Sequence, residues 1–480
     1  MKKLTYVLNG LTKDSIPDIE IESICFDPNK CTEKDLLFLT NKHDVDEYIS
    51  LLPKAAAIVS GFPLSDNISD TVVYIIPLIR NAISIACSRF YCNDISKIKF
   101  IGITGTNGKS STAIILEKII SDYGYRVGLI GTGKIKIGNN ILSPECYSMT
   151  TPPPSLLYSA IGRMEKIGVD VIIMEVSSHA LDQYRVSAID FDIGIFTNLS
   201  EEHLDYHKSM EEYFRSKCKL LEHSKHIIAN GDDEYGKDVV RNFIGSDVCG
   251  QGDNASIKIS SIQNLGFLGS KFNYKSDLNE TDIITHLPEI YNVYNIALAI
   301  RAAEILGVPK ENIKDSIEII QEIDGRYSVI RDSITVIIDY AHTALAFHNI
   351  LKSLYSLKKQ RQNLIVVFGC GGERDKCKRF AMGRICEEYA DRIIITSDNS
   401  RGESPMDIIS DITRDITKQH EIIVDRKNAI KHAVISANAG DLVAIIGKGP
   451  ERYIISNGIY YPFDESEIVR SALKERCDAN

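Results

Sequence analysis

Residues 97–111 read KIKFIGITGTNGKSS, and this stretch decides the fold. A strand-like apolar run, Ile98–Thr104, leads into the glycine-rich turn GTNGKS, and a helical pattern follows over Thr112–Ser121. This order is typical of a phosphate-binding loop, because glycines let backbone N–H groups curl around a phosphate and the helix dipole favours its negative charge. The sequence therefore predicts a parallel α/β sheet with a nucleotide site at the turn.

The turn carries the polar side chains that a nucleoside triphosphate requires. Lys109 is expected to reach the β- and γ-phosphates, and the Ser110 hydroxyl to face Mg²⁺. The full motif has one more glycine, at the position where this chain has Ile103. An ordinary turn into a helix is the alternative, and the flanking strand and helix argue against it. The candidate nucleotide-binding residues of the loop are Gly105, Thr106, Asn107, Gly108, Lys109, Ser110 and Ser111.

The composition bounds the classes of function. Of 480 residues, 44% are hydrophobic, and 55 Lys and Arg against 65 Asp and Glu give a net charge of −10, which argues against nucleic-acid and membrane partners. No apolar run reaches the roughly 18–20 residues of a membrane span, and the N-terminus MKKLTYVLNG lacks the apolar segment of a signal peptide. The 11 cysteines form no CxxC pair, so we expect reduced thiols in a cytoplasmic protein.

Three regions of different pattern predict an α/β protein of three domains. Residues 1–96 are weakly patterned and predict a small α/β N-domain. Residues 97–325 alternate short apolar runs with helical patterns, which predicts a central P-loop-type parallel-sheet domain that binds ATP. The same alternation over residues 326–480 predicts a C-terminal Rossmann-like domain. Ligands of such sheets bind at the carboxyl ends of the strands, so a cleft between the last two domains is the expected site.

Two further polar motifs follow predicted strands. Glu175 opens EVSSH after the apolar run Val171–Met174, where a carboxylate could bind Mg²⁺. The alternative is an acidic residue at a helix N-terminus. TNLSEEHLDYH, which places His203, Asp205 and His207 close together, also begins at a strand end. A single histidine there would most simply be structural, but the cluster favours a site.

A set of motifs in fixed order resembles the Mur ligase family. They span residues 102–451 and read GTNGKS, EVSSHAL, TNLSEEHLDYH, NVYN, GR, DYAHT, FGCGGERD, SDN and GKG. The resemblance implies that ATP phosphorylates a carboxylate and that an amine then displaces phosphate. Negative charge accumulates on crowded oxygens in such a reaction, so cations and backbone donors matter more than bases.

The resemblance also implies roles for particular residues. Lys109, Glu175, His203 and Lys217 would be catalytic, and Ser110, Glu175, His203 and Lys217 would hold Mg²⁺, with Lys217 as a carbamate. A carbamate suits Mg²⁺ because it is an anionic oxygen ligand, although Lys219 lies nearby and a solvated lysine is the alternative. Nucleotide contacts would come from Asn295, Arg326, Asp339 and His342. The carboxylate substrate would be held by Thr150, Thr151, Ser177, Gln183 and Arg185.

The amine would lie against the C-terminal domain. The implied residues are Asp398, Asn399, Arg401, Gly447 and Glu451. Arg401 suggests diaminopimelate, because a guanidinium matches the second carboxylate that lysine lacks. The chain departs from the family pattern at Pro28, Asn29, Glu289, Ala344, Ser400 and Pro450. The first two weaken the family's signature for binding the UDP group.

The predicted function is ATP-dependent addition of meso-diaminopimelate to UDP-MurNAc-L-Ala-D-Glu in peptidoglycan synthesis, with ATP and Mg²⁺ as cofactors. One alternative is a paralogue that joins an amino acid to another carboxylate outside cell-wall synthesis. The second alternative is a non-catalytic module or a simple nucleoside triphosphatase. The candidate metal cluster argues against this second alternative. We expect small-molecule substrates, no nucleic acid or membrane partner, and a monomer.

Overall fold

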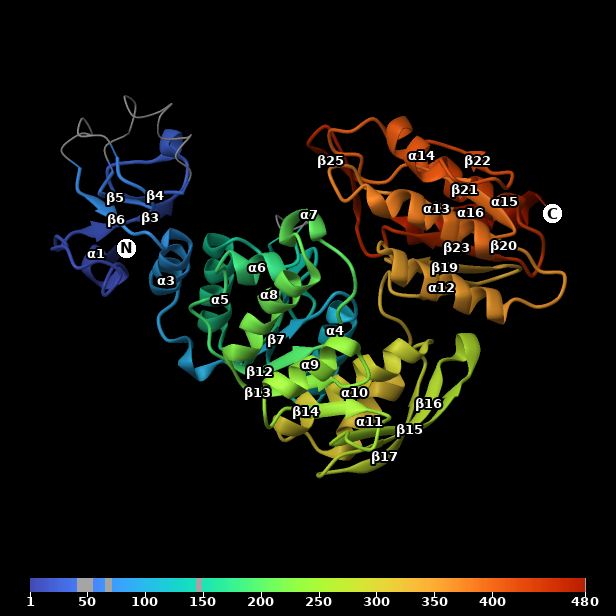
Figure 1. Ribbon diagram of the computed structural model, residues 1–480, viewed down its shortest axis with the longest axis horizontal. Coiled ribbons are helices and arrows are strands. Elements are labelled where there is room, and N and C mark those ends of the chain that lie inside the picture. Colours follow the sequence, from blue (N-terminus) through green and yellow to red (C-terminus); the bar gives the residue numbers. More distant parts are fainter. Residues whose placement is uncertain (41–54, 65–70, 144–148, 480) are drawn as a thin grey trace.

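Three α/β domains make up the chain, each built on its own sheet (Figure 1). The structure is a computed structural model and describes residues 1–40, 55–64, 71–143 and 149–479. The ten cysteines in this part of the chain are free thiols. None of the helices described there is long and apolar enough to cross a membrane.

The N-terminal domain contains a four-stranded parallel sheet. Its strands, in spatial order, are β3 (Ser23–Cys25), β4 (Asp35–Leu39), β5 (Ala57–Ser60) and β6 (Val73–Ile75). A small antiparallel pair, β1 (Lys2–Lys3) with β2 (Glu20–Ile21), and helix α1 (Leu4–Val7) lie beside it. Helix α3 (Ile79–Tyr91) packs against α5 (Pro154–Ile167) of the central domain, where Ser84 Oγ lies 2.9 Å from Tyr158 OH. The first domain is therefore joined to the second by a shared hydrophobic core.

The central domain is an eleven-stranded sheet with β7 (Lys99–Thr104) near its middle. Parallel neighbours β11 (Val171–Glu175) and β12 (Phe191–Phe196) flank β7. The parallel region also contains β8 (Val127–Gly131), β13 (Ser224–Asn230), β14 (Asp247–Gly250) and β15 (Ile257–Asn264). The edges are antiparallel and were not predicted: β9 (Lys134–Ile137), β10 (Asn140–Ser143), β16 (Ser270–Lys275) and β17 (Glu280–Thr285). Partly exposed positions interrupt these edge strands, so they lack the continuous apolar runs of buried strands.

Helices cover both faces of the central sheet. Ile101 and Ile103 of β7 pack in one core with α4 (Lys109–Asp122), α10 (Ile290–Ile305) and α11 (Lys310–Ile319). Phe100 points to the other face and packs with α5 and with Leu220 of α8 (Met210–Glu222). Alternate residues of a strand face opposite sides of the sheet. The buried residues of β7 therefore contribute to the hydrophobic cores on both faces.

The C-terminal domain is a second doubly wound sheet. Its spatial order is β18 (Ser328–Arg331), β19 (Thr335–Asp339), β23 (Leu442–Ile446), β20 (Leu364–Phe368), β21 (Arg392–Ile395) and β22 (Glu421–Ile422). All pairs are parallel except β18 with β19. One face packs on α12 (Ala344–Leu357), α13 (Cys377–Tyr389) and α14 (Pro405–Thr413), and the other on α15 (Arg426–Ser436) and α16 (Glu465–Ala479). A hairpin, β24 (Tyr453–Ser456) with β25 (Ile459–Pro462), extends from this domain.

Candidate active site

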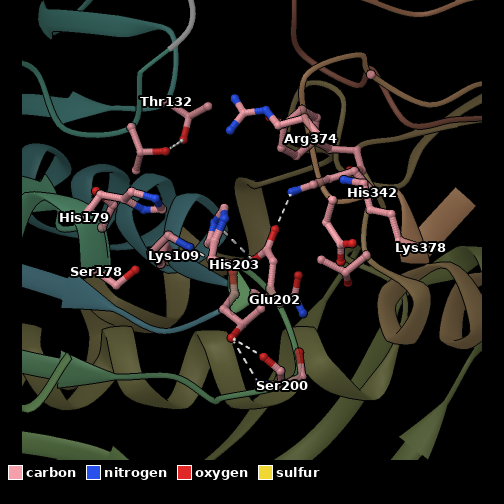
Figure 2. A pocket seen from close by; sticks show the side chains of 18 of the residues that line it. Lys109, Thr132, Ser178, His179, Ser200, Glu202, His203, His342, Arg374 and Lys378 are labelled. Carbon is pink, nitrogen blue, oxygen red and sulfur yellow. Dashed lines mark hydrogen bonds and ion pairs between the residues drawn. The ribbon is translucent and has the colours of Figure 1, made fainter. Parts of the chain in front are cut away.

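A cleft of about 850 Å³ is lined by residues of both the central and the C-terminal domains. Figure 2 shows Lys109, His203 and Glu202 on one side, with His342, Arg374 and Lys378 opposite them. On the central side the lining comes from the ends of β7, β8, β11 and β12, and on the C-terminal side from the ends of β19, β20, β21 and β23. These are the carboxyl ends of strands, where ligands of parallel sheets bind.

The predicted phosphate loop lies between β7 and α4. Gly105 has φ +146°, and a Cβ atom there would lie 1.9 Å from Thr197 Oγ1, so only glycine fits. Gly108 has φ +85° and caps α4. The Asn198 side chain accepts a hydrogen bond from the Asn107 backbone N–H (3.0 Å), which holds the loop against the end of β12.

Two lysines converge on this loop, the half-buried Lys109 and the buried Lys217. Lys109 Nζ donates to the carbonyls of Gly105 (2.9 Å) and Thr106 (2.8 Å), and Lys217 Nζ donates to the same Gly105 carbonyl (2.8 Å). Burial lowers the pKa of both amines, and for Lys217 the charge of Lys109 lowers it further. Lys219, in contrast, pairs with Asp182 at 3.2 Å and does not line the cleft. Of the two lysines in this stretch of α8, only Lys217 lies at the phosphate loop.

An oxygen-rich cluster lies beside the lysines. Ser110 Oγ donates to Glu175 Oε2 (2.7 Å), and Thr132 donates to the same carboxylate through its backbone N–H (2.9 Å) and its hydroxyl (3.1 Å). Across the cleft, Arg326 Nη2 donates to Ser110 Oγ (3.0 Å). The Nε atom of Arg326 is buried and has no hydrogen-bond partner in the described part of the chain, which leaves a donor suited to a phosphate oxygen.

His203 lies close to this cluster, and its chemistry suits a metal. It adopts a left-handed backbone, φ 58°, at the start of α7 (Leu204–His207). Burial lowers the pKa of His203 to about 4, so its ring is neutral near pH 7 and keeps a lone pair. Glu175 and Ser110 offer oxygen donors of the kind that Mg²⁺ prefers, and His203, which lines the same cleft, offers a neutral nitrogen donor. Among the described residues no group of three or more His, Cys, Asp and Glu could hold a metal, so water or substrate oxygens would have to complete the shell.

Glu202 was missed by the sequence analysis, although it precedes His203 in the quoted motif. Its Oε1 atom lies 3.1 Å from His342 Nε2 of the C-terminal domain, as the dashed line in Figure 2 shows. Burial alone would raise the pKa of Glu202, but the hydrogen bond to His342 and the nearby charge of Lys109 hold it well below its usual range. Glu202 is therefore an anion that links the two domains beside the phosphate loop.

The residues predicted for the carboxylate substrate form a connected group on the central side. Thr151 Oγ1 donates to the Glu175 carbonyl (2.8 Å) and accepts from the Ser177 N–H (3.0 Å). Arg185 donates to the Thr151 carbonyl (2.6 Å) and, through Nη2, to the Gln183 side chain (2.8 Å). The hydroxyl oxygen of Thr150 lies 3.2 Å from the hydroxyl oxygen of Thr132.

The residues predicted for the amine gather on the C-terminal side. Asn399 Nδ2 donates to Glu451 Oε2 (2.7 Å), and Arg401 Nη1 donates to the Gly372 carbonyl (2.7 Å). Gly447 has φ +116° at the end of β23. Burial would raise the pKa of Asp398, but Lys448 and Arg426 lower it to about 2. Arg401 thus lies at the same cleft as Lys109, which the chain places 292 positions earlier.

Most of the predicted site residues line this cleft, but four do not. Asn295 is buried and lies beneath the loop, where it accepts from Thr112 (3.3 Å), and Asp339 accepts the backbone N–H groups of Tyr327 and Ala341 (both 2.7 Å). Gln183 supports Arg185, and the Gly105 carbonyl accepts the two lysines. These four residues shape the walls of the cleft in this structure.

Other lining residues were given no role from the sequence, although Arg374 lies within the quoted motif FGCGGERD. Arg374 and Lys378 belong to the glycine-rich segment after β20 and the start of α13, and both reach the cleft (Figure 2). Glu289, one of the departures from the family pattern, has φ 77° and is buried just outside it. Its carboxylate accepts a hydrogen bond from Ser353 of α12, so it too links the central and C-terminal domains.

This fold and this cleft define a class of enzymes with a phosphate loop in one domain and a second Rossmann-like domain facing it. Residues 103–303 match the family model described as "Mur ligase middle domain". Residues 325–449 match the family model described as "Mur ligase, glutamate ligase domain". The chain belongs to the Mur ligase family.

Individual relatives match over nearly the whole chain. A UDP-N-acetylmuramoyl-L-alanyl-D-glutamate–2,6-diaminopimelate ligase of Caldanaerobacter subterraneus is 36% identical over 470 residues, covering 96% of each chain. The Aquifex aeolicus ligase of the same name is 39% identical and covers 87% of this chain and 86% of its own. A solved structure of a ligase with this name is 28% identical, with a TM-score of 0.69 and 99% of each chain covered.

Proposed function

We propose that the chain joins meso-diaminopimelate to UDP-MurNAc-L-Ala-D-Glu, using ATP and passing through an acyl phosphate. This is the reaction named for the relatives that match over nearly its full length. The observation that carries the proposal is the single cleft in which the phosphate loop faces Asn399, Arg401 and Glu451. A ligase that couples phosphoryl transfer to amide formation needs all three reactants at one place.

The chain's own residues suit the two chemical steps. Lys109 and Arg326 supply cations where negative charge develops on the phosphoryl oxygens. Arg374 and Arg401 offer guanidinium groups for the carboxylates of diaminopimelate, and Glu451 offers a carboxylate for an ammonium group. Closure of the cleft would exclude water, which protects an acyl phosphate from hydrolysis.

Mg²⁺ would be held by Ser110, Glu175, His203 and Lys217. When bound, the ion neutralises phosphate charge. Lys217 fits this set as a carbamate, which forms when its neutral amine adds CO₂ and releases a proton. The lowered pKa of this buried amine favours the neutral form that such an addition requires.

The three domains divide the substrates between them in this proposal. Residues 1–96 would take part in binding the UDP end, residues 97–325 would bind ATP, and residues 326–480 would bind the amino acid. We expect a cytoplasmic monomer that acts on small molecules. The alternative is a paralogue that acts on another carboxylate. The names of the relatives do not support this alternative.

One product-mass experiment tests the function. The chain is incubated with ATP, Mg²⁺, UDP-MurNAc-L-Ala-D-Glu and an equimolar mixture of meso-diaminopimelate, L-lysine and other amino acids. The expected product has the mass of the diaminopimelate adduct, with one ADP formed for each product. ADP release that does not depend on any amine would instead support a nucleoside triphosphatase.

A further inference from the structure

Lys448 lies at the centre of the predicted amine site without having been assigned any role. Its side chain is fully buried, with 0% exposure. Its Nζ atom lies 3.2 Å from Asp398 Oδ1, 3.0 Å from Asn399 Oδ1 and 3.2 Å from Glu451 Oε2. One ammonium group thus contacts three of the five residues predicted for the amine.

These contacts fix how the Asn399 amide is oriented. The Oδ1 atom accepts hydrogen bonds from Lys448 and from the backbone N–H of Ile455 (2.9 Å), so Nδ2 is left to donate to Glu451 (2.7 Å). In the flipped orientation Nδ2 would face the Lys448 ammonium and the Ile455 N–H, and Oδ1 would face the Glu451 carboxylate, so Lys448 adds to the contacts that favour the observed orientation.

The same contacts extend to Arg401 through the hairpin β24–β25. Ile455, whose N–H binds Asn399, accepts the backbone N–H of Arg401 at its carbonyl (3.1 Å). Asn457 N–H donates to the Arg401 carbonyl at 2.6 Å, and Arg401 has a left-handed backbone, φ 51°. A non-glycine residue holds this conformation only where its surroundings impose it, so the hairpin determines where the Arg401 side chain begins.

Lys448 is shared between two carboxylates of the amine site. Two buried cations, Lys448 and Arg426, face three carboxylates, Asp398, Glu451 and Glu465. Glu465 is paired with Arg426 at 2.7 Å, whereas Lys448 is shared between Asp398 and Glu451. Glu451 lines the cleft with its side chain 16% exposed, so its carboxylate lies where an ammonium group of a substrate could contact it.

We propose that Lys448 is a positioning residue of the amine site: its ammonium group aligns Asn399 and Glu451 and, through the hairpin, Arg401, while leaving Glu451 available to an incoming ammonium group. This inference rests on the proposed function, because it concerns how that same site selects its amine. Lys448 itself need not touch the substrate, since it is fully buried behind the residues it orients.

The test compares Lys448→Met and Lys448→Arg with the exposed control Lys474→Met on α16. For Lys448→Met, we expect kcat/KM for meso-diaminopimelate to fall about 100-fold, mainly through KM, because two carboxylates lose their buried partner. The preference over L-lysine should shrink, and the KM for ATP should stay within about twofold. Lys448→Arg should recover part of the affinity, and Lys474→Met should behave as the unmodified chain.

Hydroxylamine provides a second readout, because it is too small to use the amine site. It displaces phosphate from the acyl phosphate and gives a hydroxamate, so its rate reports on the ATP half of the reaction. Lys448→Met should form hydroxamate at nearly the unmodified rate. Parallel loss of both activities would show a structural role and overturn the proposal, as would an unchanged amine KM. An unmodified chain that forms no hydroxamate would instead contradict the proposed function.

Discussion

His342 Nε2 of the C-terminal domain lies 3.1 Å from Glu202 Oε1 of the central domain, near the ammonium group of Lys109. This contact brings the two halves of the cleft together at the phosphate loop. Arg326 makes a second link, to Ser110, and Ser353 makes a third, to Glu289. All three join a residue of the central domain to one of the C-terminal domain, so the two domains are bridged by side-chain contacts that a nucleotide could replace or reinforce.

Replacing Glu202 by glutamine should weaken this closure. The amide keeps the shape but removes the charge that faces His342 and Lys109, so we expect kcat to fall about 10- to 100-fold. Small-angle scattering should show a more extended chain before ATP is added. Glu211→Gln, an exposed change on α8, is the control. An unchanged radius of gyration together with unchanged kcat would contradict this role.

Lys109→Ala should remove a cation from the phosphoryl-transfer site. We expect kcat to fall on the order of 10³-fold, which is typical of losing one charged contact to a transition state. The control is Lys118→Ala, on the exposed side of the same helix, where the lysine pairs with Asp122. Steady-state ADP release with all substrates present measures both variants. Near-normal turnover of Lys109→Ala would disprove the assignment of the loop.

Lys217→Ala should be inactive and should regain part of its activity with formate or acetate. The added carboxylate would replace the oxygen ligand that a carbamate on Lys217 provides. Lys219→Ala is the matched control, because Lys219 lies on the same helix but pairs with Asp182. Mass spectrometry at high bicarbonate, which preserves carbamates, gives an independent measurement. An active Lys217→Ala with an inactive Lys219→Ala would show that the other lysine carries the role.

Arg401→Ala should lose the preference for meso-diaminopimelate over L-lysine more than it loses ATP affinity. A guanidinium can meet the second carboxylate of diaminopimelate with two parallel hydrogen bonds, and lysine has no group to match it. The ratio of kcat/KM values for the two amines measures this. Arg414→Ala, 70% exposed and in the same domain, is the control. If the unmodified chain uses both amines equally, the specificity assignment is wrong.

Acid stability should depend on the pair of Asp398 and Lys448. The pKa of Asp398 is about 2 in the folded chain, below its ordinary value of 3.8. A lowered pKa means that the stabilisation is fully present above pH 3.8 and is lost as the pH falls towards 2. Lys448→Met should raise this pKa and so move acid unfolding to higher pH. Circular dichroism across this pH range measures the shift, and Lys474→Met should leave the unfolding curve unchanged.

The sequence by itself determined the parallel α/β class and the position of the phosphate loop. The apolar run of β7, the glycines and Lys109 are contiguous, so local geometry alone fixes how they meet. Most of the buried parallel strands were predicted for the same reason. The parallel strands β14 and β15 and the antiparallel edges were missed, because their partly exposed residues carry weaker patterns. Several of the motifs that resemble Mur ligases, such as EVSSHAL and SDN, directly follow predicted strands, whereas NVYN lies on α10.

Only the tertiary structure decided which distant residues share the cleft. Lys217 rather than Lys219 reaches Gly105 because of the rotation of α8 against the sheet, a relation that spacing along the helix cannot show. Glu202 meets His342, and Lys448 meets Asp398, Asn399 and Glu451, because separate strands end at the same edge of a sheet or at the facing edge of the next domain. The physical reason is that the burial of each group, and the charges that surround it, depend on residues that lie far apart in the chain. Their pKa values and their orientation therefore belong to the folded cleft and to no single segment of the sequence.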